Sequence, residues 1–424
     1  MSFSKAVFYP RYAAIRVLTR VLSDFIPLDE ALGQIVSEVP SSSLAWLQEV
    51  CSGTIRWKGR LDGILDSVAF RKKPSGWLRK VLLVAAYQLV VQDRSPAAAV
   101  VSETVEMIRE KEGEAPARFA NACLRRVAEF SSQWKNQGFP EGQVLKAESA
   151  WASLPEWLWS RLKQQHGQGW AMAYALAGLE RPTLWLRARS MSWKASWVES
   201  GPLPLSWKVI EGGAVTLKPG FLEGDWIVQD ISSQKLIAEI LEMIRLDRGD
   251  LPLRVLDLCA APGGKAVGLS WFGVKVQATE KLEKRVPLLK ETVARVAPEI
   301  EVLSWSQAQI SANQDWIWVD APCSGTGILR RHPDVRWLRQ EKELSSLHQV
   351  QEELIGMAWK NLAQGGYMTY SVCSVLKEEG PEAISQAKKS GLLPGMTQSK
   401  EWFLCPQNAP YGDGFWAVLL KKEK

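Results

Sequence analysis

The first third of the chain carries apolar residues at the spacing of amphipathic helices. In RYAAIRVLTRVLS (11–23) and LDEALGQIV (28–36), apolar residues recur every three or four positions, so they gather on one helical face. The stretch WLRKVLLVAAYQLVV (77–91) is apolar nearly all round, which predicts a helix buried at the centre of a bundle. We therefore expect an all-α domain over residues 1–135.

The pattern changes after residue 140. Two short strand-like stretches, TLWLRAR (183–189) and SWKVIEGGAVTL (206–217), are bounded or interrupted by Gly and Pro. They follow a helical stretch, PEWLWSRLKQQ (155–165). This mixture predicts a small α+β connecting domain over residues 140–225.

From residue 226 onward, strand-like stretches alternate with helical ones. The clearest strand-like stretches are LRVLDLCA (253–260), KVQATE (275–280), WIWVDAPC (316–323) and GGYMTYSVCS (365–374). Such alternation is typical of a doubly wound, Rossmann-like α/β domain, which we expect over residues 226–424. In such sheets, ligands bind beyond the carboxyl ends of the strands.

Composition narrows the class of protein. A chain of 424 residues with 46% hydrophobic and 23% charged residues is typical of a soluble protein of two or three domains. The longest apolar run (81–91) is too short to span a bilayer, and the N-terminus lacks the features of an export signal. Six cysteines without a C-x-x-C pair and only three histidines argue against a disulfide framework and a metal site. We expect a cytoplasmic monomer with no membrane or metal partner.

The basic surplus lies in the first third of the chain. Residues 1–140 contain 19 Lys and Arg against 14 Asp and Glu, whereas residues 230–424 contain 24 of each. Two clusters stand out: Arg56, Lys58 and Arg60, and then Arg71, Lys72, Lys73, Arg79 and Lys80. The surplus suits a polyanion such as RNA, but a solvated basic face without a partner explains the charge equally well.

A turn of small residues follows the first predicted strand of the α/β domain. In DLCAAPGGK (257–265), backbone amides are open to a ligand. A phosphate loop would need glycine at Cys259 and a hydroxyl at Ala266, and the turn does not fit G-x-G-x-x-G, so a dinucleotide is disfavoured. Glu280 ends the next strand, where an acid commonly binds the ribose hydroxyls. A purely structural Pro-Gly-Gly turn is the alternative.

The pattern is best explained by a nucleoside cofactor without a phosphate, such as S-adenosylmethionine. We expect it to contact the turn and two strand-end acids, namely Cys259, Ala260, Ala261, Pro262, Gly263, Gly264, Lys265, Glu280 and Asp320.

Two cysteines occupy similar positions in the α/β domain. Cys323 in IWVDAPCSGTG (317–327) and Cys373 in YMTYSVCSV (367–375) each follow a strand-like run and precede a serine. The pattern by itself does not distinguish a reactive thiol from a buried small residue at either position.

Several motifs together resemble a known family. DLCAAPGGK, DAPCSGTGILRRHPDVRW (320–337), YSVCSV (370–375) and GDGFW (412–416) are similar to motifs of the Sun/RsmB-type bacterial ribosomal RNA (cytosine-5)-methyltransferases. VQDISSQ (228–234) is similar to the segment before the family's catalytic sheet. VCSGTIRWKGRLDGIL (50–65) and ARFANACLRRV (117–127) resemble the NusB-like RNA-binding domain that one branch carries. The resemblance covers nearly the whole chain.

The resemblance implies S-adenosylmethionine-dependent methylation of carbon 5 of a cytosine in small-subunit (16S) ribosomal RNA, free or within an assembly intermediate. It makes Cys373 the nucleophile and gives Cys323 a role in releasing the product. DNA cytosine methyltransferases use a Pro-Cys thiol, and that analogy favours Cys323 instead. The thiolate chemistry needs nearby positive charge, for which Lys265 is a candidate, and Asp320 is a candidate for binding the cytosine.

The chain departs from the family pattern at a few positions. The acid expected between Glu280 and Asp320 is absent from EVLSWSQAQ (301–309), where Ser304 or Ser306 takes its place. A run of basic residues follows the Pro-Cys motif: Arg330, Arg331, His332, Arg336 and Arg339. These residues are expected to contact the RNA backbone or to order the active site. The alternative is a solvated basic helix. The alternative functions are a non-catalytic RNA-binding or ribosome-assembly protein with the same fold, and a cytosine methyltransferase acting on another RNA. A dinucleotide-dependent oxidoreductase and a DNA-directed enzyme are disfavoured.

Overall fold

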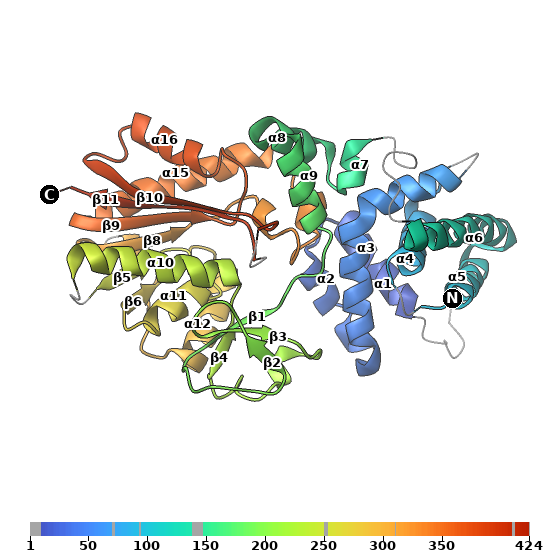
Figure 1. The fold of residues 1–424 in the computed structure, drawn as a ribbon, viewed down its shortest axis with the longest axis horizontal. Coiled ribbons are helices and arrows are strands. Elements are labelled where there is room, and N and C mark those ends of the chain that lie inside the picture. The colour runs from blue at the N-terminus through green and yellow to red at the C-terminus, as the bar shows by residue number, and fades with distance from the viewer. Residues whose placement is uncertain are drawn as a thin grey trace. The chain divides into compact units, whose positions relative to one another are not determined.

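The computed structural model describes residues 10–69, 73–92, 95–137, 147–249, 253–309, 311–408 and 412–423, with the side chains of 132–137 left aside. The chain divides into two compact units (Figure 1). The helical unit comprises Met1–Glu180 and Leu329–Glu341, and the α/β unit comprises Arg181–Ile328 and Lys342–Lys424.

The helical unit is a bundle, as the apolar spacing predicted. Its α-helices within the described residues are α1 (Pro10–Leu22), α2 (Leu28–Gly33), α3 (Ser41–Val68), α4 (Gly76–Val90), α5 (Ala97–Glu112), α6 (Glu114–Gln137), α7 (Glu148–Ala152), α8 (Glu156–His166), α9 (Gln168–Ala177) and α14 (Val335–Leu338). Every residue of α4 from Val81 to Val90 is buried, which confirms the predicted central helix.

The region 140–225, expected to form one connecting domain, is shared between the two units. Its helices α7, α8 and α9 belong to the helical unit because the start of this region packs on α3. The Ser153 hydroxyl accepts from the Gly59 amide at 3.0 Å, and Arg60 Nε donates to the Trp151 carbonyl at 2.6 Å. The strands of the region form a separate sheet in the α/β unit.

That small sheet is antiparallel, in the order β2-β3-β1-β4. Its strands are β1 (Trp185–Ala188), β2 (Val198–Ser200), β3 (Ser206–Val209) and β4 (Trp226–Val228). Trp197 and Trp226 pack edge to face with ring centroids 5.5 Å apart, so tryptophans supply much of its core.

The main sheet has the Rossmann-like form predicted from the strand–helix alternation. Within the described residues its strand order is β10-β11-β9-β8-β5-β6-β7. Strands β5 to β9 pair in parallel, and β10 and β11 are antiparallel at one edge. The strands are β5 (Arg254–Asp257), β6 (Lys275–Ala278), β7 (Glu301–Val302), β8 (Gln314–Asp320), β9 (Leu362–Val372), β10 (Met396–Leu404) and β11 (Phe415–Lys422).

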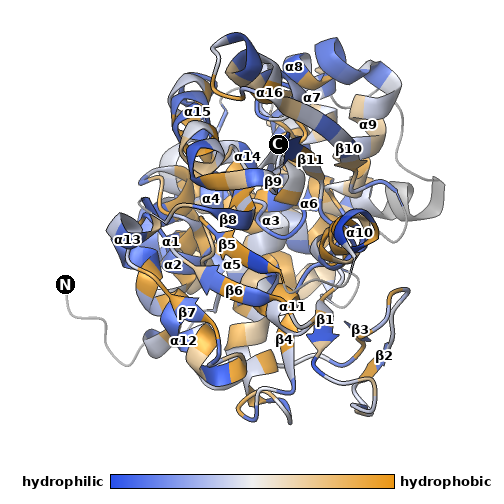
Figure 2. Cartoon of the chain, turned by 90° about the vertical axis from the view of Figure 1, so that its left-hand side faces the viewer, coloured by the Kyte–Doolittle hydropathy of each residue, from blue (hydrophilic) through white to orange (hydrophobic). Residues whose placement is uncertain are grey.

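Helices cover both faces of the main sheet (Figure 1). One face packs against α10 (Ile231–Arg248), α11 (Gly264–Ser270) and α12 (Val286–Val296), and the other against α15 (Glu343–Asn361) and α16 (Pro381–Lys389). Figure 2 shows both hydrophobic and hydrophilic residues on α10 and α12, as expected for helices that bury only one side.

The strand order fixes where a ligand belongs. Chain order runs outward from β5 through β6 to β7 and in the opposite direction through β8 to β9, so it reverses between β5 and β8. A crevice forms at the carboxyl ends of strands at such a switch point. Asp257, the last residue of β5, and Asp320, the last of β8, lie at this point.

No helix among the described residues is long and apolar enough to cross a membrane.

Candidate active site

The turn predicted to hold a cofactor connects β5 to α11. Gly263 precedes the helix with φ of 110°, a conformation that L side chains rarely adopt, and an added Cβ would lie 3.2 Å from Thr292 Cγ2. The Gly263 amide donates to the Ala260 carbonyl at 2.6 Å, which closes the turn tightly. Gly264 is the first helical residue, so the amides that begin α11 lie at the switch point.

Gln229, from the VQDISSQ segment, ties this turn to the small sheet. Its Nε2 donates to the Gly264 carbonyl at 2.6 Å, and its Oε1 accepts from Arg187 Nη1 at 3.2 Å. An added Cβ at Gly268 would lie 2.9 Å from the same Arg187 nitrogen, so glycine is required there for α11 to approach. The buried Arg187 therefore positions the turn through Gln229.

Two acids beside the turn have oxygens free to accept hydrogen bonds. Asp257 is fully buried, and neither of its carboxylate oxygens has a hydrogen-bond partner among the described residues. Burial, with the charges of Asp320 and Glu280, raises the pKa of Asp257 to about 7. Glu280 accepts from the Leu282 amide at 2.9 Å through Oε1, whereas Oε2 accepts no hydrogen bond and lies 3.5 Å from Arg285 Nη1.

These free acceptors fit a ligand with several donors, such as a ribose with its two hydroxyls and an ammonium group. Our sequence interpretation named Glu280 but not Asp257. The signal was available, because Asp257 opens the DLCAAPGGK motif.

Lys265 and Asp320 form an ion pair at the switch point. Lys265 Nζ donates to Asp320 Oδ2 at 2.6 Å, and the Lys265 side chain is 11% exposed. Asp320 Oδ1 accepts from the Ser371 hydroxyl at 2.8 Å. Burial works against the charge on Lys265, but the charges of Asp320, Asp257 and Cys373 outweigh it and raise the pKa of Lys265. The lysine therefore supplies a fixed positive charge.

The two thiols meet at the same edge of the sheet. β8 and β9 are parallel neighbours with Asp320 paired to Ser371, so the residues after each strand emerge together. Cys323 Sγ lies 3.3 Å from Cys373 Sγ, and Cys323 is buried whereas Cys373 is partly exposed. The hydrogen bond with Cys373 and burial raise the pKa of Cys323 well above its ordinary value. Cys323 therefore keeps its proton at neutral pH.

A buried glutamate that the sequence interpretation missed supports the Pro-Cys loop. Glu379 is 1% exposed, and its Oε1 and Oε2 accept from the Ser324 amide at 2.7 Å and the Ser324 hydroxyl at 2.5 Å. Gln351 Nε2 lies 3.4 Å from Oε1 and also donates to the Pro322 carbonyl at 2.9 Å. The only sequence signal was the short distance from Cys373 to Glu379.

Hydroxyl groups join this loop to the one that carries Cys373. Thr326 Oγ1 lies 3.0 Å from Ser374 Oγ and accepts from the Val375 amide at 3.1 Å. The Gly327 amide donates to the Cys373 carbonyl at 2.9 Å, and the Gly414 amide, in the GDGFW motif, donates to the Gly327 carbonyl at 2.8 Å. The hydroxyls and amides together hold the two thiol loops in register.

Not every predicted site residue has a clear place. Ser304 and Ser306, which stand where the family has an acid, are exposed and lie 3.1 Å apart through their hydroxyls. Ser304 also binds Gln307 Oε1 through its amide at 2.9 Å. Neither serine substitutes for a carboxylate in these contacts. Within the described residues, no group of three or more His, Cys, Asp or Glu side chains is placed to hold a metal ion.

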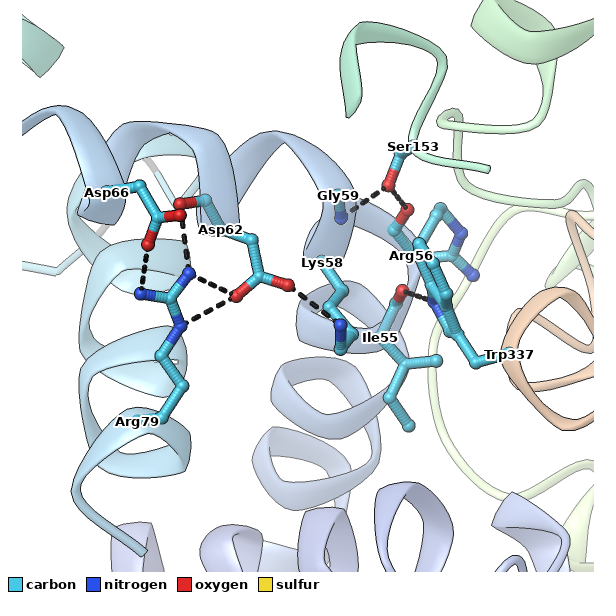
Figure 3. Close-up of polar contacts among 9 residues, drawn as sticks. All are labelled: Ile55, Arg56, Lys58, Gly59, Asp62, Asp66, Arg79, Ser153 and Trp337. Carbon is cyan, nitrogen blue, oxygen red and sulfur yellow. Dashed lines mark hydrogen bonds and ion pairs between the residues drawn. The ribbon is translucent and has the colours of Figure 1, made fainter. Parts of the chain in front are cut away.

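Most of the basic residues in the predicted clusters are engaged within the helical unit (Figure 3). Lys58 Nζ lies 2.7 Å from Asp62, and Arg79 pairs with Asp62 at 2.6 Å and with Asp66 at 2.7 Å. Lys73 also pairs with Asp66, at 2.6 Å. Arg56 and Arg60 are buried, and Arg71 and Lys72 lie outside the described residues. Charge counting alone therefore overstated the cationic surface of these clusters.

The basic run after the Pro-Cys loop is not a solvated helix. Arg336 is 1% exposed and donates to four backbone carbonyls of the helical unit, at 2.9 to 3.2 Å: those of Arg56, Ser153, Gly178 and Leu329. Trp337 Nε1 donates to the Ile55 carbonyl at 2.8 Å (Figure 3), and the Leu28 amide donates to Asp334 Oδ2 at 3.0 Å. Residues 329–341 are thus an integral part of the helical unit.

Comparison with known proteins identifies related sequences. The family model described as 16S rRNA methyltransferase RsmB/F matches residues 244–392, and the NusB family model matches residues 9–129. Ribosomal RNA small subunit methyltransferase B of Yersinia pseudotuberculosis is 30% identical, over 97% of this chain and 98% of the relative. The protein with the same name from Photorhabdus laumondii subsp. laumondii is 29% identical over the same shares.

Solved structures share the fold. The crystal structure of PH0851 superposes with a TM-score of 0.71 at 20% identity, over 99% of this chain and 100% of that one. NSun6 from Pyrococcus horikoshii, solved with SFG, superposes with a TM-score of 0.54 at 16% identity, over 64% of this chain and 98% of that one. At these identities the structural likeness shows the fold alone.

Proposed function

This chain belongs to the RsmB/F family of 16S rRNA methyltransferases, and from that premise we propose that it methylates carbon 5 of a cytosine in 16S ribosomal RNA. The methyl donor is S-adenosylmethionine, and the reaction passes through a covalent bond between Cys373 and the base. The observation that carries the proposal is the pair of thiols, 3.3 Å apart, at the strand ends beside Lys265 and Asp320.

Carbon 5 of cytosine is a poor nucleophile, so the reaction needs covalent activation. The lone pair of the Cys373 thiolate forms a bond to carbon 6, and the electrons of the ring double bond make carbon 5 nucleophilic. Lys265 supplies a positive charge that interacts with Cys373. Asp320, held by Lys265 at 2.6 Å, accepts a hydrogen bond from the exocyclic amino group of the base.

Product release requires the reverse movement of electrons. Once carbon 5 carries the methyl group, a base from solvent takes its proton, the electron pair of that C–H bond restores the ring double bond, and the bond between carbon 6 and sulfur breaks. Cys323 holds a proton and hydrogen-bonds Cys373, so it can protonate the departing sulfur and prevent it from adding again. This division of roles makes Cys373 the nucleophile and Cys323 the release acid.

The turn and the strand-end acids are suited to the cofactor. S-adenosylmethionine, when bound, supplies an electrophilic methyl group. The free Oε2 of Glu280 suits a ribose hydroxyl, and the unpartnered oxygens of Asp257 suit a donor from the same ligand. The contact surface is the turn that we predicted from the sequence: Cys259, Ala260, Ala261, Pro262, Gly263, Gly264 and Lys265.

The two thiol variants test the proposal directly. Cys373→Ala should form no covalent complex with 16S rRNA, because no thiolate remains beside Lys265. Cys323→Ala should attack and methylate but stall before release, so a protein–RNA complex should survive denaturing electrophoresis. An adduct in Cys373→Ala, with none in Cys323→Ala, would reverse the two roles.

Bisulfite sequencing of total RNA, with and without the gene, identifies the substrate. We expect one 16S rRNA cytosine to lose its protection when the gene is absent. Loss of protection only in another RNA would move the activity to that RNA, and no change anywhere would favour the non-catalytic RNA-binding alternative.

A further inference from the structure

A groove of about 510 Å³ runs between α5 and α6 in the helical unit. Its apolar lining consists of small and aliphatic residues, of which Val105 and Ala117 are buried: Ala97, Ala98, Val101, Val105, Ala117 and Ala128. The polar side chains that line it are Ser102, Glu106, Arg109, Arg118, Asn121 and Arg125. The groove is therefore lined by apolar side chains together with three arginines and one glutamate.

The sequence of α6 explains how its polar residues reach the groove. Arg118, Asn121 and Arg125 are separated by three and four positions, so they share one helical face. Cys123, Leu124 and Val127 are buried in the core of the unit. The three groove residues thus form a row along the helix, and seven residues place the two arginines about 10 Å apart along its axis.

The positive charge of this row is not neutralised by the protein. Arg109, at one end of the groove, pairs with Glu106 and with Glu114. Arg118 and Arg125 are exposed, and neither forms an ion pair or hydrogen bond within the described part of the chain. In this respect Arg118 and Arg125 differ from Lys58, Lys73 and Arg79, whose charges are balanced by aspartates.

We propose that this groove binds the sugar–phosphate backbone of one strand of the substrate RNA. This inference rests on the proposed function. Arg118 and Arg125 contact phosphates, since guanidinium groups bind phosphate oxygens with two parallel hydrogen bonds, and Asn121 lies between them to bind a ribose or phosphate oxygen. The lining contains no aromatic side chain on which a base could stack, so the groove positions the RNA without reading its sequence.

The double variant R118A/R125A tests the inference in the full-length protein. Binding of in vitro transcribed 16S rRNA is measured by filter binding over a series of KCl concentrations. We expect roughly a tenfold loss of affinity, and the log–log dependence of affinity on salt should become shallower by about 1.4, because each phosphate contact in a single strand contributes about 0.7. R118K/R125K keeps both charges and should retain the salt dependence.

R20A/K111A is the matched control, because it removes two positive charges from the same unit at residues that do not line the groove. An equal loss in R20A/K111A would overturn the inference and leave only general electrostatic attraction. Unchanged affinity and slope in R118A/R125A would also overturn it, and would point to a protein partner for the groove.

Methyl transfer by the wild-type enzyme, measured in parallel with labelled S-adenosylmethionine, separates this inference from the proposed function. If the wild type methylates 16S rRNA and R118A/R125A binds it normally, only the groove inference fails. If the wild type neither binds nor methylates the RNA, both fail.

Discussion

Glu379→Gln tests whether the buried carboxylate holds the Pro-Cys loop in its reactive position. The substitution keeps the size of the side chain but replaces one accepting oxygen by an NH2 group. Ser324 donates to Glu379 from its amide at 2.7 Å and from its hydroxyl at 2.5 Å. The amide can still donate to the glutamine oxygen, but the hydroxyl must reverse and accept from the NH2 group. Both bonds lose the strength that the carboxylate charge gives them.

The cost follows from these contacts. A buried hydrogen bond to a charged group contributes about 1.5–3 kcal/mol and a neutral one about 0.5–1.5 kcal/mol, and E379Q converts two bonds of the first kind into the second. Because the loop relaxes in part, we expect a total of about 2–4 kcal/mol, shared between the free energy of unfolding and the positioning of the loop. If the loop alone bears the cost, the methylation kcat falls by roughly 30- to 1000-fold.

The assays separate these contributions. Urea unfolding gives the loss of stability, and steady-state methylation gives kcat and KM. Calorimetric binding of S-adenosylmethionine should be unchanged, since Glu379 makes none of the contacts at Asp257 or Glu280. Glu382→Gln, an exposed glutamate in the first turn of α16, is the matched control. The reasoning is refuted if E379Q matches E382Q in both stability and kcat.

Three further variants test separate parts of the structure. Glu280→Ala should weaken S-adenosylmethionine binding by about 1.5–3 kcal/mol in calorimetry, and tight NAD binding instead would contradict the cofactor assignment. Asp257 has a pKa raised to about 7 by burial, so the native state binds its proton more tightly than the unfolded chain, and wild-type stability should decline from about pH 4 to pH 7. The free energy of unfolding of Asp257→Asn should not show this decline, and above pH 7 it should exceed that of the wild type by up to roughly 4 kcal/mol. A variant whose pH profile equals that of the wild type would contradict the assignment of the raised pKa to Asp257. Arg336→Ala removes one donor from four carbonyls, of which that of Arg56 still accepts from the Ser153 hydroxyl, and should cost about 3–5 kcal/mol in denaturant unfolding. A near-neutral effect would show that residues 329–341 contribute little to the helical unit.

Local patterns in the sequence were enough to establish the fold class. The segment 81–90 is apolar on nearly every face, so it predicted a buried helix, although it includes Gln88. The alternation after residue 226 required a doubly wound sheet, since parallel strands need a helical crossover between them. The turn after β5 and the two strand-end cysteines could also be identified, because topology brings the carboxyl ends of parallel strands to one edge.

Charge and proton placement, in contrast, were decided by the tertiary structure. Arg79 of α4 looked available for RNA until the fold placed Asp62 and Asp66 of α3 beside it, whereas Arg118 and Arg125 remain exposed and unpaired within the described residues. The same holds for Glu379, whose function depends on a contact with Ser324 55 residues away. Hydrophobic periodicity reports on neighbours along one element, whereas ion pairing, burial and the proton on Cys323 depend on groups that only the folded chain brings together.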